Sequence, residues 1–410
     1  MGLGEALAPL RERRFRLLWL GRVSSAIGDA LVPVALTFAV LSIDRSGAAL
    51  GAVLAAFGLS RIAFTLAGGV VADRVSRRTV MLTSDVVRGS VHAFTAAMLL
   101  THHMTIPLFV VTEAVFGTAS AFFGPAADGL VPQTTTSKNL QPANARLGIS
   151  RNTMNVFGPT LSGLIVATAG AGYVFAIDAA SFAASALFLV PLHVDGPIRG
   201  ARTRIVTELR EGFHEVASRP WVRVPLAAFA ISNVAFASFI VLGPLIFLDH
   251  FAHAKTAWGL VSTFGSIGAI VGALLSVRIR PVHPLSAAFV ASTLIAVPIA
   301  ALSGPLPVAV LAVAWGFGMG AVALANTWWE TTLQRRIPEH VYSRVRSYDI
   351  LVSFVFMPIG LLAFGPIGDV FGYEPTLLVA AGIAAVTNVV VAFSPAVRAE
   401  EAAPNPAPAT

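Results

Sequence analysis

The sequence contains no cysteine, and this absence excludes disulfide bonds, thiolate zinc sites and iron–sulfur clusters. Charged residues are scarce as well. They make up 12% of the 410 residues, whereas about a quarter of the residues in a soluble domain are charged. Hydrophobic residues reach 56%. The missing charge argues against a soluble globular domain, so the composition predicts a membrane protein with several spans.

Lysine is almost absent. Neither Lys138 nor Lys255 follows the glycine that a phosphate-binding Gly-Lys-Ser/Thr loop needs. After His214-Glu215 there is no second histidine at position 218, which a zinc protease of the His-Glu-x-x-His type requires. We therefore expect no enzymatic activity, no metal site and no cofactor.

Twelve apolar runs are each long enough to cross about 30 Å of hydrocarbon as a helix. The first six are 16–42, 48–72, 79–101, 106–128, 152–169 and 172–191, and the second six are 221–248, 256–277, 283–302, 306–330, 347–371 and 374–394. The sequence thus predicts an all-α membrane protein with 12 transmembrane helices in two six-helix bundles. Proline and glycine recur in the fifth and eleventh runs, as Pro159-x-x-x-Gly163 and Pro358-x-Gly360, so we expect the bundles to be pseudo-symmetric.

The longest polar stretch of the chain separates the two sets of runs. The predicted segments are an N-terminal bundle, a linker, a C-terminal bundle and a disordered tail rich in Ala and Pro, at 1–191, 192–220, 221–396 and 397–410. Within the linker, Ile205, Leu209, Phe213 and Val216 recur at helical spacing. We therefore predict an amphipathic helix that lies on the cytoplasmic membrane surface.

The basic residues are distributed unevenly between the two sides of the membrane. Almost all of the 28 Lys and Arg residues fall in loops on one side, whereas Arg45 and Lys255 fall on the other. Short loops rich in Lys and Arg stay in the cytoplasm. We therefore predict that both termini are cytoplasmic and that the protein lies in the inner membrane of a cell. Because orientation accounts for the net charge of +7, no nucleic-acid partner is expected.

The loop between the second and third runs carries a dense cluster of fixed charges. It reads Gly69-x-x-x-Asp73-Arg74-x-x-Arg77-Arg78. This pattern resembles the signature loop of the major facilitator superfamily of secondary transporters, although Ser76 stands where that family usually has glycine. The resemblance implies a gate that latches the two halves on the cytoplasmic side. Asp128 resembles the acid that pairs with the loop arginine in that family. The alternative is that the arginines only orient the protein.

Two further stretches are similar to one branch of that superfamily. They are Leu18-Trp19-Leu20-Gly21-Arg22-x-x-Ser25-x-x-Gly28-Asp29 and the loop with Gln334, Pro338 and Arg344. The branch holds bacterial macrolide-efflux and enterobactin-exporter-like proteins. The resemblance implies a proton-driven exporter of drugs or secondary metabolites that works by alternating access. Its expected partners are a small amphipathic substrate, protons and membrane lipids, and the protein is expected to be a monomer.

Seven charged residues interrupt the apolar runs of the first half. They are Arg22, Asp29, Arg61, Asp85, Arg88, Glu113 and Asp178. Each costs about 2.5–3.5 kcal/mol at the centre of a spanning helix, so each is a functional candidate. With four acids against three bases, one carboxyl group lacks a basic partner and is a candidate proton carrier.

Proton coupling is predicted at Asp29, Glu113 and Arg61. Asp29 lies about 20 Å into the first run at 1.5 Å per residue, near the middle of the membrane. The first and fourth helices line the central cavity in the family, which implies that Asp29 and Glu113 bind protons and attract cationic substrates. Arg61 could release an acid when that acid is protonated. The alternative is a buried ion pair, for example Asp29 with Arg61, that only stabilises the bundle.

The other charged residues of these runs form a predicted polar core. Asp85, Arg88 and His92 share one helix face, and Asp85 and Arg88 can neutralise each other within the helix. His92 is either a proton relay or a buried histidine with satisfied hydrogen bonds. Asp178 is interpreted as a polar group in the packing, and Arg22 belongs to the polar face of the first run.

The fifth run partly resembles the antiporter motif of the superfamily. Gly158-Pro159 and Gly163 predict a kinked helix that packs closely against a neighbour. The motif favours antiport over symport. A proton symporter that imports a small metabolite is the alternative function, and a membrane scaffold or sensor without transport is the other.

Aromatic residues and two amides mark the second half. Phe229, Asn233 and Phe236 lie in the seventh run, and Trp315 and Asn326 lie in the tenth. Aromatic walls with few polar groups suit bulky amphipathic ligands. We therefore predict that these residues line a substrate cavity, although ordinary packing explains each of them as well.

Overall fold

The computed structural model describes residues 8–194 and 212–402, apart from the side chains of residues 66, 73, 339–340, 343 and 353–354. Every regular element in these ranges is a helix, as the sequence predicts. Within the described residues, ten candidate spans are long and apolar enough to cross a membrane. The count of twelve and the orientation of the termini stay predictions.

Two long helices fall outside these ten because polar residues interrupt them. Helix α4 (Arg77–Leu100) has 24 residues and includes Asp85, Arg88 and His92. Helix α6 (Leu140–Thr168) has 29 residues and includes Arg146 and Arg151. Both lengths suffice to cross a bilayer, since a span needs about 20 residues.

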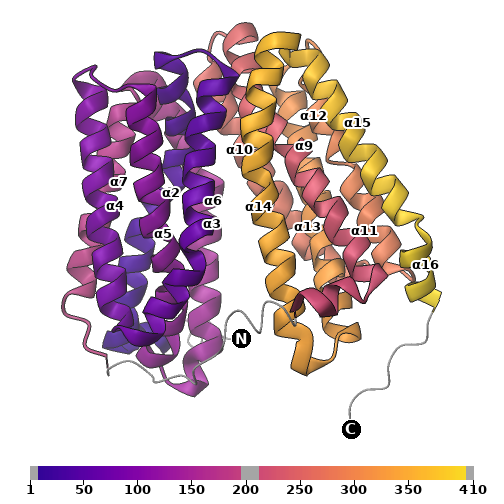
Figure 1. The fold of residues 1–410 in the computed structure, drawn as a ribbon. Coiled ribbons are helices and arrows are strands. Elements are labelled where there is room, and N and C mark those ends of the chain that lie inside the picture. The colour runs from indigo at the N-terminus through magenta and orange to yellow at the C-terminus, as the bar shows by residue number, and fades with distance from the viewer. Residues whose placement is uncertain (1–7, 195–211, 403–410) are drawn as a thin grey trace. The chain divides into compact units, whose positions relative to one another are not determined.

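The helices group into two compact units, which Figure 1 labels along the chain. The first unit comprises Met1–Arg45, Ala52–Ala201 and Phe251–Thr263, and the second comprises Ser46–Gly51, Arg202–His250 and Phe264–Thr410. Two long helices, α3 (Gly47–Arg74) and α10 (Ala254–Arg278), therefore contribute residues to both units.

The other elements of the first unit are η1, α2, α5, η2 and α7. Their bounds are Ala8–Arg11, Arg13–Ile43, Ile106–Thr134, Ser137–Asn139 and Ala171–Leu189. Helix α7 packs against both α2 and α4, α4 also packs against α5, and α2 against α6 (Figure 1). These contacts bring the polar positions of α2, α4, α5 and α7 to the inside of one bundle.

The other elements of the second unit are α9 and α11 to α16. Their bounds are Pro220–His250, Pro284–Thr293, Ala296–Ala301, Val308–Arg336, Glu339–Phe371, Tyr373–Ala392 and Pro395–Ala402. Helix α15 packs against α9 and α11, α11 also packs against α13, and α9 against α14. When α9, α11, α13, α14 and α15 are matched in chain order to α2, α4, α5, α6 and α7, these are the same pairings as in the first unit.

One predicted span is interrupted. The run at 283–302 forms α11 and α12, with a turn at Leu294 and Ile295 between them. Pro298 has no backbone N–H with which to continue the helical hydrogen bonds from Leu294. The run is nevertheless one candidate span, Pro284–Ala301.

Glycines replace side chains where α10 and α13 cross. A Cβ atom at Gly268 would lie 1.8 Å from the carbonyl oxygen of Gly316, and one at Gly272 would lie 1.9 Å from that of Gly320. The two helices thus meet backbone to backbone through paired Gly-x-x-x-Gly stretches, which is the packing that small residues permit in membranes.

We expect Gly268→Ala to destabilise the protein by about 1–3 kcal/mol, because a methyl group has no space at this crossing. Thermal unfolding of the purified protein in detergent measures the change. Gly382→Ala is the matched control, since nothing lies within 4 Å of a Cβ atom there, and the better helix propensity of alanine makes it neutral or slightly stabilising. Equal unfolding temperatures for the two variants would contradict the crossing.

A carboxylate caps the first turn of α3. Asp369 of α14 accepts hydrogen bonds from the backbone N–H groups of Gly47 and Ala48, at 2.8 and 2.9 Å. A negative charge at a helix N-terminus satisfies free N–H groups and interacts favourably with the helix dipole. The first turn of α3 is thereby fixed to α14 within the second unit.

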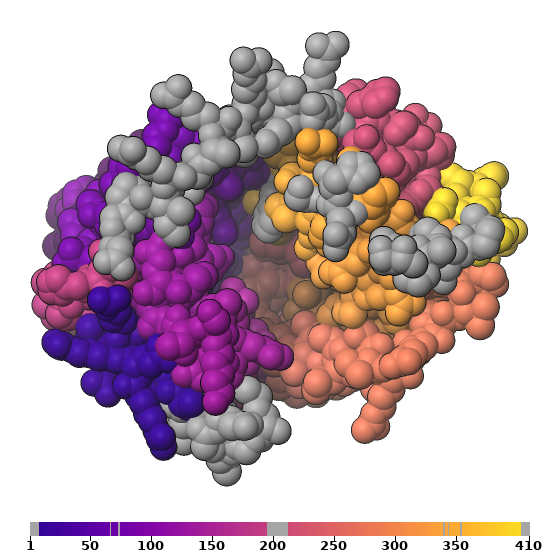
Figure 2. All heavy atoms as spheres, turned by 90° about the horizontal axis from the view of Figure 1, so that it is seen from below, coloured from indigo at the N-terminus to yellow at the C-terminus, as the bar shows by residue number. Residues whose placement is uncertain are grey.

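The start of the predicted disordered tail is helical instead. Helix α16 covers 395–402, and Val397 is buried against the core of the second unit. Glu400 pairs with Arg336 at 2.9 Å, and Glu401 accepts hydrogen bonds from the backbone and hydroxyl of Ser286. The prediction was wrong for 397–402 because these tertiary contacts order the segment, and 403–410 lie outside the described residues. Figure 2 shows α16 in yellow beside the pink start of α9.

The predicted amphipathic linker helix falls mostly outside the described residues, which resume at 212. Of its four apolar positions, Phe213 and Val216 are described. Val216 is buried in the core of the second unit, whereas Phe213 is largely exposed.

Glu12 joins two segments at one end of the first unit. It accepts hydrogen bonds from the side chains of Asn139 and Thr135, at 2.6 and 3.1 Å, and from the backbone of Thr136. Burial disfavours its charged form, but these hydrogen bonds outweigh burial and lower the pKa of this carboxyl from its ordinary value of 4.5.

The ionised Glu12 therefore stabilises the fold above pH 4.5, and this contribution is lost as the pH falls through the lowered pKa of the folded state. We expect Glu12→Gln to lower stability by about 1 kcal/mol near neutral pH, and the difference to disappear in acid. Unfolding temperatures of both proteins from pH 3 to 7 measure it. Glu374→Gln is the control, because Glu374 has no hydrogen bond or ion pair with described residues. A deficit that grows in acid would contradict this assignment.

Candidate functional site

A cavity of about 740 Å³ lies within the first unit, between helices α2, α3, α4, α5 and α6. Its polar lining residues are Arg22, Ser25, Asp29, Arg61, Arg88, Glu113, Ser120, Asp128, Asn144, Ser150 and Arg151. Both acids predicted for proton coupling line it, and so does Arg61. Five of the seven predicted charged residues of these runs thus line one cavity, and Asp85 and Asp178 do not.

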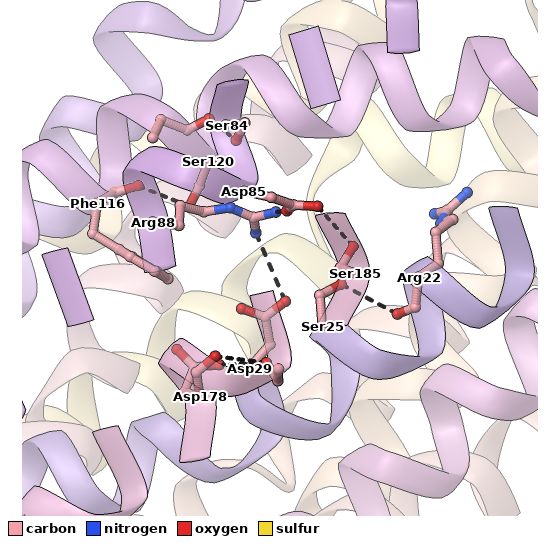
Figure 3. Close-up of polar contacts among 12 residues, drawn as sticks. Arg22, Ser25, Asp29, Ser84, Asp85, Arg88, Phe116, Ser120, Asp178 and Ser185 are labelled. Carbon is pink, nitrogen blue, oxygen red and sulfur yellow. Dashed lines mark hydrogen bonds and ion pairs between the residues drawn. The ribbon is translucent and has the colours of Figure 1, made fainter. Parts of the chain in front are cut away.

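Asp29 lies at the cavity and faces an arginine of another helix. Its Oδ2 is 3.8 Å from Nη1 of Arg88, and 43% of its side chain is exposed. Arg88 also contacts Asp85 at 2.5 Å, one helical turn away, and Asp85 accepts a hydrogen bond from Ser185 of α7 at 2.7 Å. Figure 3 shows the guanidinium of Arg88 between the two carboxyl groups. The predicted in-helix pair of Asp85 and Arg88 therefore forms, with Asp29 as a third member.

Two aromatic rings hold this guanidinium in place. The centres of the Phe123 and Phe182 rings lie 4.1 and 4.3 Å from Cζ of Arg88. Such cation–π contacts are strongest where water is excluded, and Arg88 is only 3% exposed. The charge of Arg88 is thus fixed between the acids.

His92, one helical turn further along α4, links two more acids. Its Nδ1 is hydrogen-bonded to Asp178 of α7, and its Nε2 lies 3.7 Å from Oε1 of Glu113 on α5. All three side chains are buried. The ring of His92 stacks on Phe116 at 3.9 Å between centres. Asp178, interpreted from the sequence as a polar group in the packing, is thus the direct hydrogen-bond partner of His92.

Four carboxyl groups share two basic groups in this polar network, which we define as Asp29, Asp85, Arg88, His92, Glu113 and Asp178. Oε1 of Glu113 and Nε2 of His92 have no hydrogen-bond partner among the described residues, although they face each other. A shift of less than 1 Å would bring their 3.7 Å separation to hydrogen-bonding distance. The arrangement can therefore transfer a proton between carboxyl and imidazole groups.

Arg22 and Arg61 lie outside this network. Arg22 pairs with Asp128 at 3.1 Å. Arg61 has no ion pair with described residues, and its guanidinium lies 5.9 Å from the ring centre of Phe57. The pair of Asp29 with Arg61 that the sequence allows does not form, because Arg88 is the arginine that faces Asp29.

Two of the signature-loop arginines donate hydrogen bonds to backbone carbonyl groups of neighbouring helices. Arg77 donates a hydrogen bond to the carbonyl of Gly129 on α5 at 2.5 Å. Arg78 donates to the carbonyls of Leu189 and Val190, where α7 ends. A cation there complements the helix dipole. Arg74 ends α3 and is exposed.

Of the residues predicted for the gate, Asp128 has a different partner from the one expected, and the side chain of Asp73 cannot be compared. Asp128, expected to answer a loop arginine, forms its ion pair with Arg22 of α2. Gly68, which precedes the motif, packs closely, since a Cβ atom there would lie 2.5 Å from the carbonyl oxygen of Ala121, whereas nothing lies within 4 Å of a Cβ atom at Gly69. The side chain of Asp73 is outside the described part of the chain.

The antiporter-like stretch of α6 packs as closely as its glycines predict. A Cβ atom at Gly158 would lie 2.6 Å from that of Ala30 on α2, and one at Gly163 would lie 2.5 Å from the carbonyl oxygen of Lys255. Pro159 lies inside the helix. On the same turn, the hydroxyl groups of Thr160 and Thr263 are 2.7 Å apart. All these contacts lie within the first unit.

A second cavity, of about 320 Å³, lies within the second unit. Four of the five predicted substrate residues line it, namely Phe229, Asn233, Phe236 and Asn326. Trp315 does not line it, because its ring stacks on Phe239 at 3.6 Å between centres and fills the space beside Gly265.

Sequence reasoning missed the charged residues of this second cavity. Arg346 bridges Glu330 and Asp349, and Asp349 also accepts a hydrogen bond from Nε1 of Trp329 at 3.2 Å. In the sequence, Arg346 precedes the run predicted to begin at 347, so it is predicted to lie in a cytoplasmic loop whose positive charge orients the protein in the membrane. The spacing of Arg346 and Asp349, one helical turn apart, is the signal that could have found the pair.

Comparison with known proteins identifies the family. A model of the transmembrane secretion effector family matches residues 4–409, nearly the whole chain. The chain belongs to this family of the major facilitator superfamily. The resemblance drawn from the signature loop is thereby confirmed.

Two relatives match most of the length of this chain. It is 28% identical over 407 residues to the multidrug efflux pump Tap of Mycobacterium tuberculosis, with 95% of each chain covered. It is 23% identical over 359 residues to the enterobactin exporter EntS of Escherichia coli, with 86% of this chain and 85% of EntS covered. A crystal structure of the nucleoside transporter NupG has a TM-score of 0.73 at 14% identity and covers 92% of this chain and 98% of that one. The chain is thus a multi-pass membrane protein whose relatives and fold are those of transporters, not enzymes.

Proposed function

We propose that this protein is a secondary active exporter that exchanges small amphipathic molecules for protons by alternating access. The single observation that carries the proton coupling is the polar network of the first unit. It places four carboxyl groups around one guanidinium and one imidazole, beside a cavity.

The charge balance of this network supports proton binding. If all four carboxyl groups were ionised, Arg88 and a protonated His92 would still leave two negative charges uncompensated. Buried charges without partners cost several kcal/mol each. The network is therefore proposed to hold protons when it is closed to water, and to lose them when one member is exposed.

Asp29 is proposed as the member through which protons enter and leave. Its side chain is 43% exposed at the cavity, whereas those of Asp85, Glu113 and Asp178 are at most 3% exposed. Protonation of Asp29 would weaken its attraction to Arg88 at 3.8 Å. Arg88 would then neutralise Asp85 alone, and this change of partner is a charge rearrangement that a conformational cycle can use.

The direction of transport is proposed from the relatives. Tap is a multidrug efflux pump and EntS an enterobactin exporter. The close packing at Gly158 and Gly163 is consistent with the antiporter motif. We further propose the bacterial inner membrane as location, a gating role for the signature loop, and function as a monomer with no cofactor.

Everted membrane vesicles that contain the protein test this function. An acid-inside proton gradient is set up, a pH-sensitive dye reports it, and ethidium is added outside as the first of a panel of amphipathic cations. An exporter that exchanges substrate for protons dissipates the gradient when a substrate is added. Vesicles from cells without the protein are the control.

The alternative functions give different results in the same vesicles. A proton symporter would acidify the interior further when it carries its substrate inward. A membrane scaffold would leave the gradient unchanged for every compound in the panel. Either result would reject proton-coupled export.

A further inference from the structure

An acceptor without a donor belongs to a residue that lines the cavity of the second unit. The side chain of Asn388 on α15 lines this cavity, and the residue is only 1% exposed. Its Oδ1 is buried and has no hydrogen-bond partner among the described residues. Buried polar atoms are paired with few exceptions, and each exception calls for an explanation.

The neighbours of Asn388 determine which end of its amide faces the unpaired position. Its Nδ2 lies 2.8 Å from the carbonyl oxygen of Ala384 and 3.2 Å from Oγ of Ser232. A carbonyl oxygen only accepts hydrogen bonds, so the atom beside it must be the NH₂ group. The unpaired atom is therefore an oxygen, and it needs a donor.

The charges at the same cavity favour a positive partner. Among its lining residues, Glu330 and Asp349 are acidic and Arg346 is basic. Arg346 contacts both acids. When all three are ionised, the group carries one net negative charge. The side chain of Glu330 is 43% exposed, so its charge is accessible from the cavity.

Aromatic rings supply the apolar wall. Phe229 and Trp329 line the cavity and contact each other edge to face, with ring centres 5.3 Å apart. Cavities of this kind hold an apolar body by burial and orient it through a few polar groups.

We propose that this cavity binds the protonated amine of an amphipathic substrate, with an N–H of the amine donated to Oδ1 of Asn388. The aromatic part of the molecule contacts Phe229 and Trp329, and Glu330 supplies the compensating charge. This inference rests on the proposed export function and names its substrate class. Asn388 is then a specificity residue that distinguishes amines with an N–H from quaternary cations of equal charge.

Two probes with the same ring and charge test the inference. They are 1-naphthylmethylammonium and (1-naphthylmethyl)trimethylammonium, in which three methyl groups replace the three N–H hydrogens. Equilibrium dialysis against the purified full-length protein in detergent gives both dissociation constants. We expect wild-type protein to prefer the ammonium probe by about tenfold, the size of a hydrogen bond to a charged group.

Substitutions at Asn388 should change this ratio and little else. Asn388→Leu removes the acceptor and is expected to bring the ratio close to one. Asn388→Asp keeps an acceptor oxygen and is expected to retain the preference. Asn152→Leu, an exposed asparagine of α6 in the first unit, is the matched control and should leave the ratio unchanged. If the leucine variant does not fold, Asn388→Ala replaces it, since the ratio does not depend on the amount of folded protein.

The outcomes separate this inference from the proposed function. A wild-type ratio near one, or a ratio unchanged in both Asn388→Leu and Asn388→Ala, would overturn the amine site. If these variants lose the preference for the ammonium probe and the vesicles show no substrate-driven proton exchange, the amine site stands and only the proposed proton exchange is rejected.

Discussion

Asp29→Asn is expected to reduce substrate-driven proton exchange to the background of vesicles without the protein. Asparagine has nearly the shape of aspartate but can neither gain nor lose a proton at physiological pH. It also removes the attraction between this position and Arg88, which is 3.8 Å away. If Asp29 is the exposed member of the polar network, its replacement leaves the buried carboxyl groups without a route to water.

The measurement compares initial rates of gradient dissipation in everted vesicles with equal amounts of protein. Asp44→Asn is the matched control, because Asp44 is an exposed aspartate just after the same helix, α2. This control should exchange protons like the wild type. Exchange by Asp29→Asn at the wild-type rate across the whole pH range would show that another acid carries the proton.

Arg88→Met is expected to destabilise the folded protein by about 3–5 kcal/mol, the usual cost of removing one partner from a buried ion pair. Asp85 would lose its 2.5 Å contact and Asp29 its nearest base. The contacts with Phe123 and Phe182 would lose their cation as well. Unfolding of the purified protein in detergent, followed by temperature or denaturant, measures the loss.

Two further variants separate charge from packing. Arg88→Lys keeps the positive charge but not the flat guanidinium between two rings, so we expect a smaller loss. Arg88→Met combined with Asp85→Leu removes both members of the pair, and apolar replacements of a buried pair are often tolerated. We expect the double variant to be more stable than Arg88→Met alone. Wild-type stability for Arg88→Met would mean that the network contributes nothing to the fold.

Local features of the fold could be predicted from the sequence. Apolar runs identify spans because the bilayer requires a fixed length of hydrocarbon. The pair of Asp85 and Arg88 follows from helical spacing alone. The break between α11 and α12 has a local cause too, in Pro298, but length and apolarity do not reveal it.

Contacts between helices could not be predicted in the same way. That Asp178 binds His92, or that Asp128 pairs with Arg22, depends on how α7 packs on α4 and α5 on α2. Helix α16 has too few apolar residues for its docking to be predicted. It is held instead by Glu400 and Glu401, whose partners lie far away in the chain. The same holds for Asn388, which looks like an ordinary polar residue in an apolar run until its missing partner is seen.

The crossing of α10 and α13 also limits where the second unit can bend. At a joint made of main-chain atoms, no side chain is available to change rotamer, so sliding or rolling of one helix on the other has no low-energy path. The two helices should therefore be displaced together as a stiff pair. Flexing is expected elsewhere in the unit, at the break between α11 and α12 and in α9 and α14, where prolines interrupt the main-chain hydrogen bonds at Pro225, Pro244, Pro358 and Pro366.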